Sequence, residues 1–280
     1  MRPGHPWANG CSLDDPEATT EVATQMTCGV ESYGAMRVGL VSDIHGNLPA
    51  FEAVLEGLER EELDRVICLG DICFGPQAHE CLELVRSRGW PVILGNWDSW
   101  SIEGFPRADD PVGIMLYEIG AWWAKLLDAD DRAFVSSFVP TLELPLDNGL
   151  KMLCFHGSPN SFSDWIFSTT PDSELEEMFG ERDASVLVGG HTHLQMLRRF
   201  GPSMIVNPGS VGQPFSQWWP RPIQVAHWAE YGVIDSSGER VGVELRRVPY
   251  DVDRLLALLG ASGMPHARWW IDSWNAEPLA

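Results

Sequence analysis

Basic residues are scarce in this chain of 280 residues. It carries 19 lysines and arginines against 40 aspartates and glutamates, which gives a formal net charge of -21. Such a surplus of negative charge repels a nucleic-acid backbone at long range, so we expect no binding to long DNA or RNA. An anionic ligand would need strong local positive charge, and bound divalent metal ions would supply it.

Long apolar runs and paired cysteines are also missing. No run approaches the roughly 18 apolar residues that a membrane span needs, so we expect no membrane partner. The six cysteines include no C-x-x-C pair, and Cys68 and Cys154 lie within apolar, strand-like segments. This usage predicts reduced thiols in a cytoplasmic protein rather than a disulfide framework. The sequence leaves the oligomeric state open.

The first part of the chain differs from the rest. Residues 1–35 show no hydrophobic periodicity and lack the apolar stretch of a signal peptide. We predict that they form a disordered N-terminal extension, and Met36, directly before the first strong strand, is a candidate start of the protein. Residues 36–280 are predicted to form a single domain.

Apolar runs and helical patterns alternate after the extension. Strands are expected at 37–43, 64–71 and 91–98, with helices at 48–60 and 79–89 between them. This order is typical of a parallel sheet built from strand–helix–strand units. Ligands of such sheets bind at the carboxyl edge of the strands, so that edge is where we expect a functional site.

The remaining chain is predicted to be helical first and strand-rich later. Helical spacing covers 111–127 and 129–139. The runs at 150–159, 184–193 and 203–210 predict further strands. Those at 230–237 and 240–248 predict an antiparallel pair of strands, and 251–263 predicts a closing helix. The aromatic-rich tail that follows is expected to pack back on the body of the protein.

Residue types that bind metals stand where the expected strands end. Seven of them, usually beside a glycine, are Asp43, His45, Asp71, Asn96, His156, His191 and His193. Any one alone could be a turn or cap residue, but their recurrence at one sheet edge predicts a metal site. Mixed Asp, Asn and His ligands suit divalent manganese, iron or zinc. Two such ions about 3.5–4 Å apart can clamp a phosphoryl group and activate a water.

These residues fall into short motifs in a fixed order. The motifs are D-x-H at Asp43, G-D at Gly70, G-N-x-D at Gly95, a single histidine at His156 and G-H-x-H at Gly190. As a set they resemble the calcineurin-like metallophosphoesterase superfamily. Weaker similarity over 207–214 and 243–253 resembles its bacterial, small phosphodiesterase-like branch. The resemblance implies an α/β fold, a four-layer α/β/β/α sandwich of mixed sheets flanked by helices.

The resemblance also implies how metal ions are held. One ion would be bound by Asp43, His45, Asp71 and His193, and the other by Asp71, Asn96, His156 and His191. Asp71 would bridge the two ions and contact the nucleophilic water, and metal-bound hydroxide would attack phosphorus in a small phosphodiester or nucleotide. Two manganese ions are expected, with iron, zinc or nickel as alternatives.

The sequence departs from the family at Trp97, which stands where the G-N-x-D motif usually has a histidine. That histidine lies near the leaving-group oxygen and can donate a proton, whereas an indole N–H cannot act as an acid. General-acid help is worth roughly 10²–10⁴-fold, so we expect a preference for diesters over simple monoesters. His79 and His227 are candidate substitutes, and Asp98 is expected to make a hydrogen bond at the start of the next helix.

Three residues are candidate substrate contacts. Asn47 could bind a substrate phosphate or cap the following helix. Trp97 could touch substrate with its indole N–H, and Arg221, in the aromatic stretch "PFSQWWPRP", could pair with a phosphate. Trp218 and Trp219 in the same stretch could stack on a nucleobase.

Two other functions are compatible with the motifs. One is a metal-binding scaffold or sensor that keeps the fold with little turnover, because a retromer subunit that resembles this superfamily also lacks the motif histidine. The other is a protein serine/threonine phosphatase. The segment after Asp71, "ICFGP", lacks the Asp-Arg pair of those phosphatases, which disfavours the second alternative.

Overall fold

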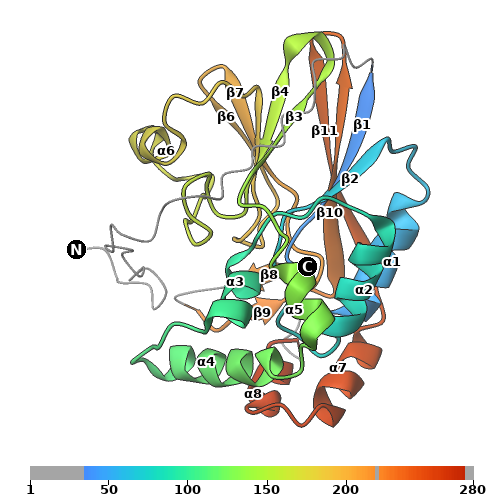
Figure 1. Ribbon diagram of the computed structural model, residues 1–280, viewed down its shortest axis with the longest axis vertical. Coiled ribbons are helices and arrows are strands. Elements are labelled where there is room, and N and C mark those ends of the chain that lie inside the picture. The colour runs from blue at the N-terminus through green and yellow to red at the C-terminus, as the bar shows by residue number, and fades with distance from the viewer. Residues whose placement is uncertain (1–34, 218–220, 275–280) are drawn as a thin grey trace.

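Two β-sheets packed face to face form the centre of the structure, a computed structural model that describes residues 35–217 and 221–274 (Figure 1). The first sheet has the order β11-β10-β1-β2 and consists of β1 (Met36–Val41), β2 (Arg65–Cys68), β10 (Trp228–Ser237) and β11 (Arg240–Pro249). The second has the order β3-β4-β5-β7-β6 and consists of β3 (Leu142–Pro145), β4 (Lys151–Cys154), β5 (Val186–Val188), β6 (Met196–Phe200) and β7 (Ser203–Asn207). Except for Ala35, the predicted disordered extension lies outside the described residues.

Apolar residues from both sheets fill the space between them. Leu40 and Ile67 of the first sheet and Met152 and Val188 of the second are fully buried in one cluster. The outer face of the first sheet is covered by α1 (Leu48–Leu58) and α2 (Ala78–Arg88), and α6 (Asp172–Phe179) packs its Leu175 against the outer face of the second. The predicted four-layer α/β/β/α architecture with mixed sheets is therefore confirmed.

Strand pairing follows the sequence pattern in the first sheet. β1 and β2 are parallel, β10 and β11 are antiparallel, and β1 pairs antiparallel with β10 from Met36 opposite Ser236 onward. The strand predicted at 91–98 is confirmed only at its start. Val92 forms an isolated parallel bridge to Cys68 of β2 and Ile93 one to Val139, but the chain then turns at Gly95 into α3 (Asn96–Glu103).

The described part of the C-terminal tail, which ends at Trp274, packs on the body of the protein, as predicted. Here α7 (Val252–Ala261) and α8 (Ala267–Asp272) share an apolar cluster with α4 (Pro111–Ala124), and Trp274 is 2% exposed. The other described elements are α5 (Ala129–Val135), the 3-10 turn Asp147–Gly149 and the small sheet of β8 (Phe215–Gln217) with β9 (Gln224–Val225).

Two absences in the described ranges bear on the sequence predictions. None of the helices in residues 35–217 and 221–274 is long and apolar enough to cross a membrane. The four cysteines in those ranges, Cys68, Cys73, Cys81 and Cys154, are unpaired and buried, as expected for reduced thiols.

Candidate metal centre

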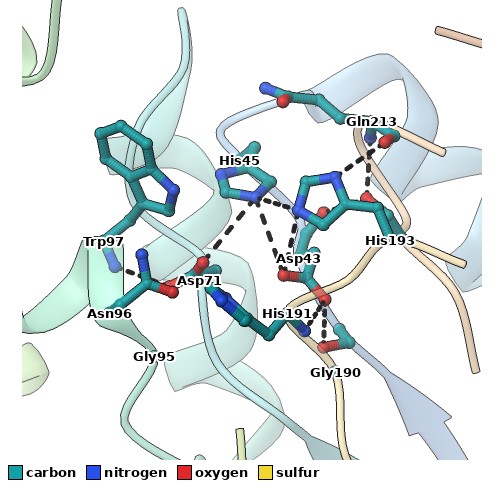
Figure 2. A network of polar contacts seen from close by, with 12 residues as sticks. Asp43, His45, Asp71, Gly95, Asn96, Trp97, Gly190, His191, His193 and Gln213 are labelled. Atoms are coloured by element: carbon teal, nitrogen blue, oxygen red, sulfur yellow. Dashed lines mark hydrogen bonds and ion pairs between the residues drawn. The ribbon is translucent and has the colours of Figure 1, made fainter. Parts of the chain in front are cut away.

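Five loops at the carboxyl ends of the strands bring the seven predicted ligands together. The β1 loop supplies Asp43 and His45, the β2 loop Asp71, the start of α3 Asn96, the β4 loop His156, and the β5 loop His191 and His193. All seven side chains belong to residues that are between 0 and 9% exposed. Figure 2 shows that the carboxylates and imidazoles converge on one small volume.

The backbone of these loops is held in an uncommon conformation. Five of the seven residues have left-handed φ angles: Asp43 (55°), His45 (49°), Asp71 (55°), His191 (66°) and His193 (57°). This conformation costs a residue with a Cβ atom roughly 1–2 kcal/mol. Such strain persists where surrounding contacts enforce it, and it clusters at functional sites. Here the loops lock each other, because the amides of Asp43 and His45 donate to the carbonyls of Gly70 (2.9 Å) and Asp71 (3.0 Å).

The ligand atoms form two adjacent groups. Asp43, His45 and His193 make one group, and Asp71, His156 and His191 make the other, with all ligand atoms of a group within 4.8 Å of one another. Asn96 joins the second group, since its Oδ1 lies 3.1 Å from His156 Nε2. Asp71 Oδ2 faces both groups, at 3.2 Å from His156 Nε2 and 3.9 Å from His45 Nε2. The structure thus brings the predicted ligands together, with Asp71 grouped with His156 and His191, and the binding of two ions with Asp71 as the bridge stays a prediction.

Backbone carbonyls fix the tautomers of two histidines. His156 Nδ1–H donates to the Leu69 carbonyl (2.7 Å), and His193 Nδ1–H donates to the Gln213 carbonyl (2.8 Å). A carbonyl only accepts hydrogen bonds, so the Nε2 atom of each neutral ring carries its lone pair toward the centre. Second contacts of this kind orient the histidine ligands of metal sites.

Several buried acceptor atoms in the centre lack a donor. Asp43 Oδ1, Asp71 Oδ2 and His191 Nε2 are buried and have no hydrogen-bond partner. The Nε2 atoms of His45 and His193 lie 3.0 Å apart. A buried acceptor without a donor costs about 1–3 kcal/mol, and more when it is charged. Cations would satisfy these convergent lone pairs, so the residues present fit a pair of divalent metal ions.

Electrostatics keep two of the histidines neutral. Burial lowers the pKa of His45 to about 4 and that of His191 to about 3, which leaves both rings unprotonated at neutral pH, as metal ligands must be. His156 differs, because burial opposes its protonation but the carboxylates of Asp71 and Asp43 raise its pKa to about 9. In the metal-free protein at neutral pH, His156 is therefore protonated and places one positive charge beside Asp71 and Asp43.

Comparison with known proteins identifies the family. Residues 36–226 match the calcineurin-like phosphoesterase superfamily domain, a range that includes all seven ligands. The chain belongs to the calcineurin-like phosphoesterase superfamily.

Two solved structures and one further sequence resemble this superfamily member. A metallophosphoesterase from Sphaerobacter thermophilus is 27% identical with a TM-score of 0.64, covering 85% of this chain and 98% of its own. A hypothetical protein from Pyrococcus horikoshii OT3 has the same fold, with a TM-score of 0.68, 22% identity and coverage of 84% and 96%. An uncharacterized protein of Methanocaldococcus jannaschii is 25% identical over 248 residues, which is 81% of this chain and 93% of the relative.

Asp98 organises the phosphoesterase loop that carries Asp71. Its buried carboxylate accepts the backbone N–H groups of Asp71 (2.7 Å), Ile72 (3.0 Å) and Cys73 (2.9 Å), as well as that of Gly95 (3.3 Å) at the start of α3. The predicted hydrogen bond at the helix start is present, and the same side chain also fixes the neighbouring loop. Gly95 is required here, because a Cβ atom on it would lie 2.1 Å from Asp71 Oδ1.

Replacing Asp98 by alanine is expected to lower the free energy of unfolding by about 3–5 kcal/mol. Each buried N–H left without an acceptor costs about 1–3 kcal/mol, and water that enters the space would satisfy part of the set. Urea unfolding of the metal-free protein would measure the loss. The control is Asp110→Ala, which removes the partly exposed cap of α4 and should cost about 1 kcal/mol. Equal losses in the two variants would contradict the role given to Asp98.

The predicted substrate contacts lie in three different settings. Asn47 Oδ1 accepts the Ala50 N–H as the cap of α1, and its Nδ2 donates to the Gly212 carbonyl. The Trp97 ring packs against Phe74, with 3.9 Å between ring centroids, while its backbone N–H donates to Asp71 Oδ1 (2.8 Å). Arg221 is exposed. Substrate contact by these residues stays a prediction, and Trp218 and Trp219 lie outside the described residues.

Neither candidate substitute for the motif histidine reaches the centre. His79 Nδ1 pairs with Asp131 Oδ2 of α5 at 2.9 Å, and its side chain is 52% exposed. His227 Nε2 donates to the carbonyl of Trp274 in the C-terminal tail (2.6 Å). Among the described histidines, these two are therefore occupied by structural contacts away from the seven ligands.

Sequence analysis missed the residues that hold the ligands in place. Ser42 Oγ and the His191 N–H both donate to Asp43 Oδ2, at 2.6 and 3.1 Å. The loop after β7 supports the same region, since Ser210 Oγ and the Gly212 N–H donate to the Asp43 carbonyl, at 2.8 and 3.0 Å. The family similarity of "NPGSVGQP", residues 207–214, marks this loop in the sequence but does not indicate which atoms it contacts.

Proposed function

We propose that the protein is a dinuclear metal-dependent phosphoesterase that hydrolyses a small phosphodiester or nucleotide. The observation that carries the proposal is the pair of adjacent buried ligand groups, which Asp71 Oδ2 faces from the second group and which contain acceptor atoms without donors. Family membership supports the same class of reaction. Two divalent cations, for which we propose manganese ahead of iron, zinc or nickel, would acidify a water and stabilise charge on the phosphoryl group.

The chain's own residues prepare this centre in advance. Asp43 and Asp71 supply the negative charge, and the carbonyls of Leu69 and Gln213 hold His156 and His193 with their lone pairs inward. The backbone N–H of Trp97 donates to Asp71 Oδ1, which leaves Oδ2 directed at both ligand groups. Because the groups are buried, their electrostatic effect on a bound phosphoryl group is much stronger than it would be in water.

Two features favour a small diester as the substrate. The net charge of -21 disfavours long nucleic acids, and the recessed ligands suit a compact group. The absence of an acid at Trp97 weakens help for poor leaving groups, which supports diesters over simple monoesters. The cytoplasmic location inferred from the cysteines also stays a prediction.

A metal-binding scaffold or sensor is the second candidate, and Trp97 in place of the motif histidine favours it. A protein serine/threonine phosphatase is not proposed, because the segment after Asp71 lacks the Asp-Arg pair.

Hydrolysis assays separate the two candidates. Metal-free protein would be titrated with manganese and assayed with bis(p-nitrophenyl) phosphate and p-nitrophenyl phosphate. The enzyme proposal expects turnover that rises with manganese, stops with chelator and has the higher kcat/KM for the diester. Two bound ions per chain without turnover of either ester would reject the enzyme in favour of the scaffold.

A further inference from the structure

The side chain of Gln213 is buried beside the ligands and is not used by the fold. Gln213 is 5% exposed, and within the described ranges its carboxamide makes no hydrogen bond. Its backbone is fully engaged, because the carbonyl accepts His193 Nδ1–H (2.8 Å) and the N–H donates to Ser210 Oγ (2.8 Å). The backbone of residue 213 is therefore held by its hydrogen bonds to His193 and Ser210. These bonds would form with any residue type, so they do not explain why the side chain is a glutamine.

A small cavity, with room for about one water molecule, is lined by both Gln213 and the ligand His45. His45, Asn47 and Gln213 line its polar side, while Leu255 and Trp270 of the C-terminal helices contribute to its apolar side. His45 Nδ1 is buried and also lacks a hydrogen-bond partner. Figure 2 shows Gln213 on the same side of the network as His45 and His193.

The backbone that carries Gln213 is held firmly against the first ligand loop. The Gly212 N–H donates to the Asp43 carbonyl (3.0 Å), and Asn47 Nδ2 donates to the Gly212 carbonyl (2.9 Å). A Cβ atom on Gly212 would lie 2.0 Å from the Ile44 carbonyl oxygen, so only glycine allows this approach. A carboxamide placed from such a rigid loop is well suited to contact a ligand at a defined point.

In the described part of the chain, no cationic side chain forms an ion pair with Asp43 or Asp71 other than the histidine ligands themselves. Histidines that bind metal through Nε2 and donate Nδ1–H to a carbonyl have no proton left to offer. An amide NH₂ provides two donors and remains neutral at every pH.

We infer that the Gln213 carboxamide donates a hydrogen bond to a phosphoryl oxygen of the substrate. The inference rests on the proposed function, because it requires a phosphoryl group at the metal centre. It makes Gln213 a substrate-binding residue that donates a hydrogen bond without acting as an acid. A hydrogen bond to a charged group contributes about 10–100-fold in affinity or rate.

Gln213→Met tests the inference, because methionine matches the length of glutamine and has no donor. With the manganese-loaded protein, we expect the Kd for inorganic phosphate to rise about tenfold and kcat/KM for bis(p-nitrophenyl) phosphate to fall about 10–100-fold. Manganese affinity, measured by calorimetry, is expected to change less than twofold. The control is Gln195→Met. The Gln195 carboxamide already donates to the Arg246 and Pro208 carbonyls, so this substitution should leave phosphate binding unchanged.

The outcomes separate contact with substrate from a role in positioning ligands. Unchanged phosphate affinity in Gln213→Met would overturn the inference, as would a loss that disappears at saturating manganese, since Gln213 would then act through His45 or His193. If the wild type hydrolyses neither ester, the proposed function fails, and the phosphate measurement still decides the contact. If Gln213→Met does not fold, Gln213→Glu replaces it, and repulsion between its carboxylate and phosphate should weaken binding more than tenfold; unchanged phosphate affinity in that variant would overturn the inference.

Discussion

Asp71→Asn is expected to reduce metal-dependent phosphoester turnover by at least about 10³-fold. Asp71 Oδ2 is a buried oxygen without a donor that faces His156 and His45 across the two ligand groups. Asparagine keeps the shape but removes the charge, and it can offer only one oxygen. Loss of about 4 kcal/mol of stabilisation at such a centre corresponds to roughly three powers of ten in rate.

Manganese stoichiometry and kcat/KM should be measured on the same preparation of Asp71→Asn. We expect fewer than two tightly bound ions per chain, together with the loss of turnover. Asp235→Asn is the matched control, because Asp235 lies on β10, is 42% exposed and pairs with Arg37 far from the centre. An Asp71→Asn protein that keeps more than a tenth of wild-type kcat/KM would show that Asp71 does not bridge metals.

Manganese is expected to raise the melting temperature by roughly 8–16 °C. The metal-free centre contains buried acceptor atoms without donors, so a bound cation relieves an existing cost. Free metal at about 1,000 times its Kd stabilises the folded state by about 4 kcal/mol. For a protein of this size each kcal/mol corresponds to about 2–4 °C. Thermal unfolding with manganese and with chelator measures the shift, and equal midpoints would contradict it.

The stability of the metal-free protein is expected to be greatest near pH 6.5. His45 and His191 have folded pKa values of about 4 and 3, below the ordinary 6.5, so the unfolded chain binds more protons in that window. Their contribution is present above about pH 6.5 and is lost as the pH falls toward 4. His156, with a folded pKa of about 9, contributes stability below about pH 6.5 that is lost as the pH rises through 9. Burial raises the pKa of Asp98 to about 6, so the folded state takes up a proton there before the unfolded chain does. This one group therefore adds stability as the pH falls from 6 to 4 and offsets part of the loss from the two histidines.

Bound metal should change the shape of this pH profile. Metal ligands bind without protons, so manganese displaces the proton from His156 and removes the alkaline loss, while the acid loss becomes steeper. Urea unfolding from pH 5 to pH 9, with and without manganese, tests both limbs. A metal-free protein that is equally stable at pH 7 and pH 9 would contradict the raised pKa of His156.

The ligand positions could be predicted from sequence because strand order determines them. Apolar runs that end in Asp43, Asp71 and His156 indicate parallel strands, and parallel strands place their ends at one edge. The supporting contacts could not be predicted in this way. The carbonyls of Leu69 and Gln213 that orient two histidines are backbone atoms, and any residue type would provide them.

The strand predicted at 91–98 is too long for a similar reason. The apolar run is real, but its course after Ile93 is decided by Asp98, which reaches back to the amides of the Asp71 loop and starts α3. That contact joins residues 27 positions apart, and periodicity within a short window cannot detect it. Short helices such as α6 and α8 were missed because they contain too few turns for a clear apolar face.

The pairing of β1 with β10 has a consequence for folding during synthesis on the ribosome. Met36 and Ser236 are partners in this ladder, so the first strand leaves the ribosome about 200 residues ahead of the strand that will cover its edge. At the usual speed of synthesis, about 5–20 residues per second, the nascent chain carries an open strand edge for roughly 10–40 seconds. The closing strand arrives only after every loop that carries a predicted metal ligand has been translated. Production in cells should therefore depend on chaperones that shield that edge.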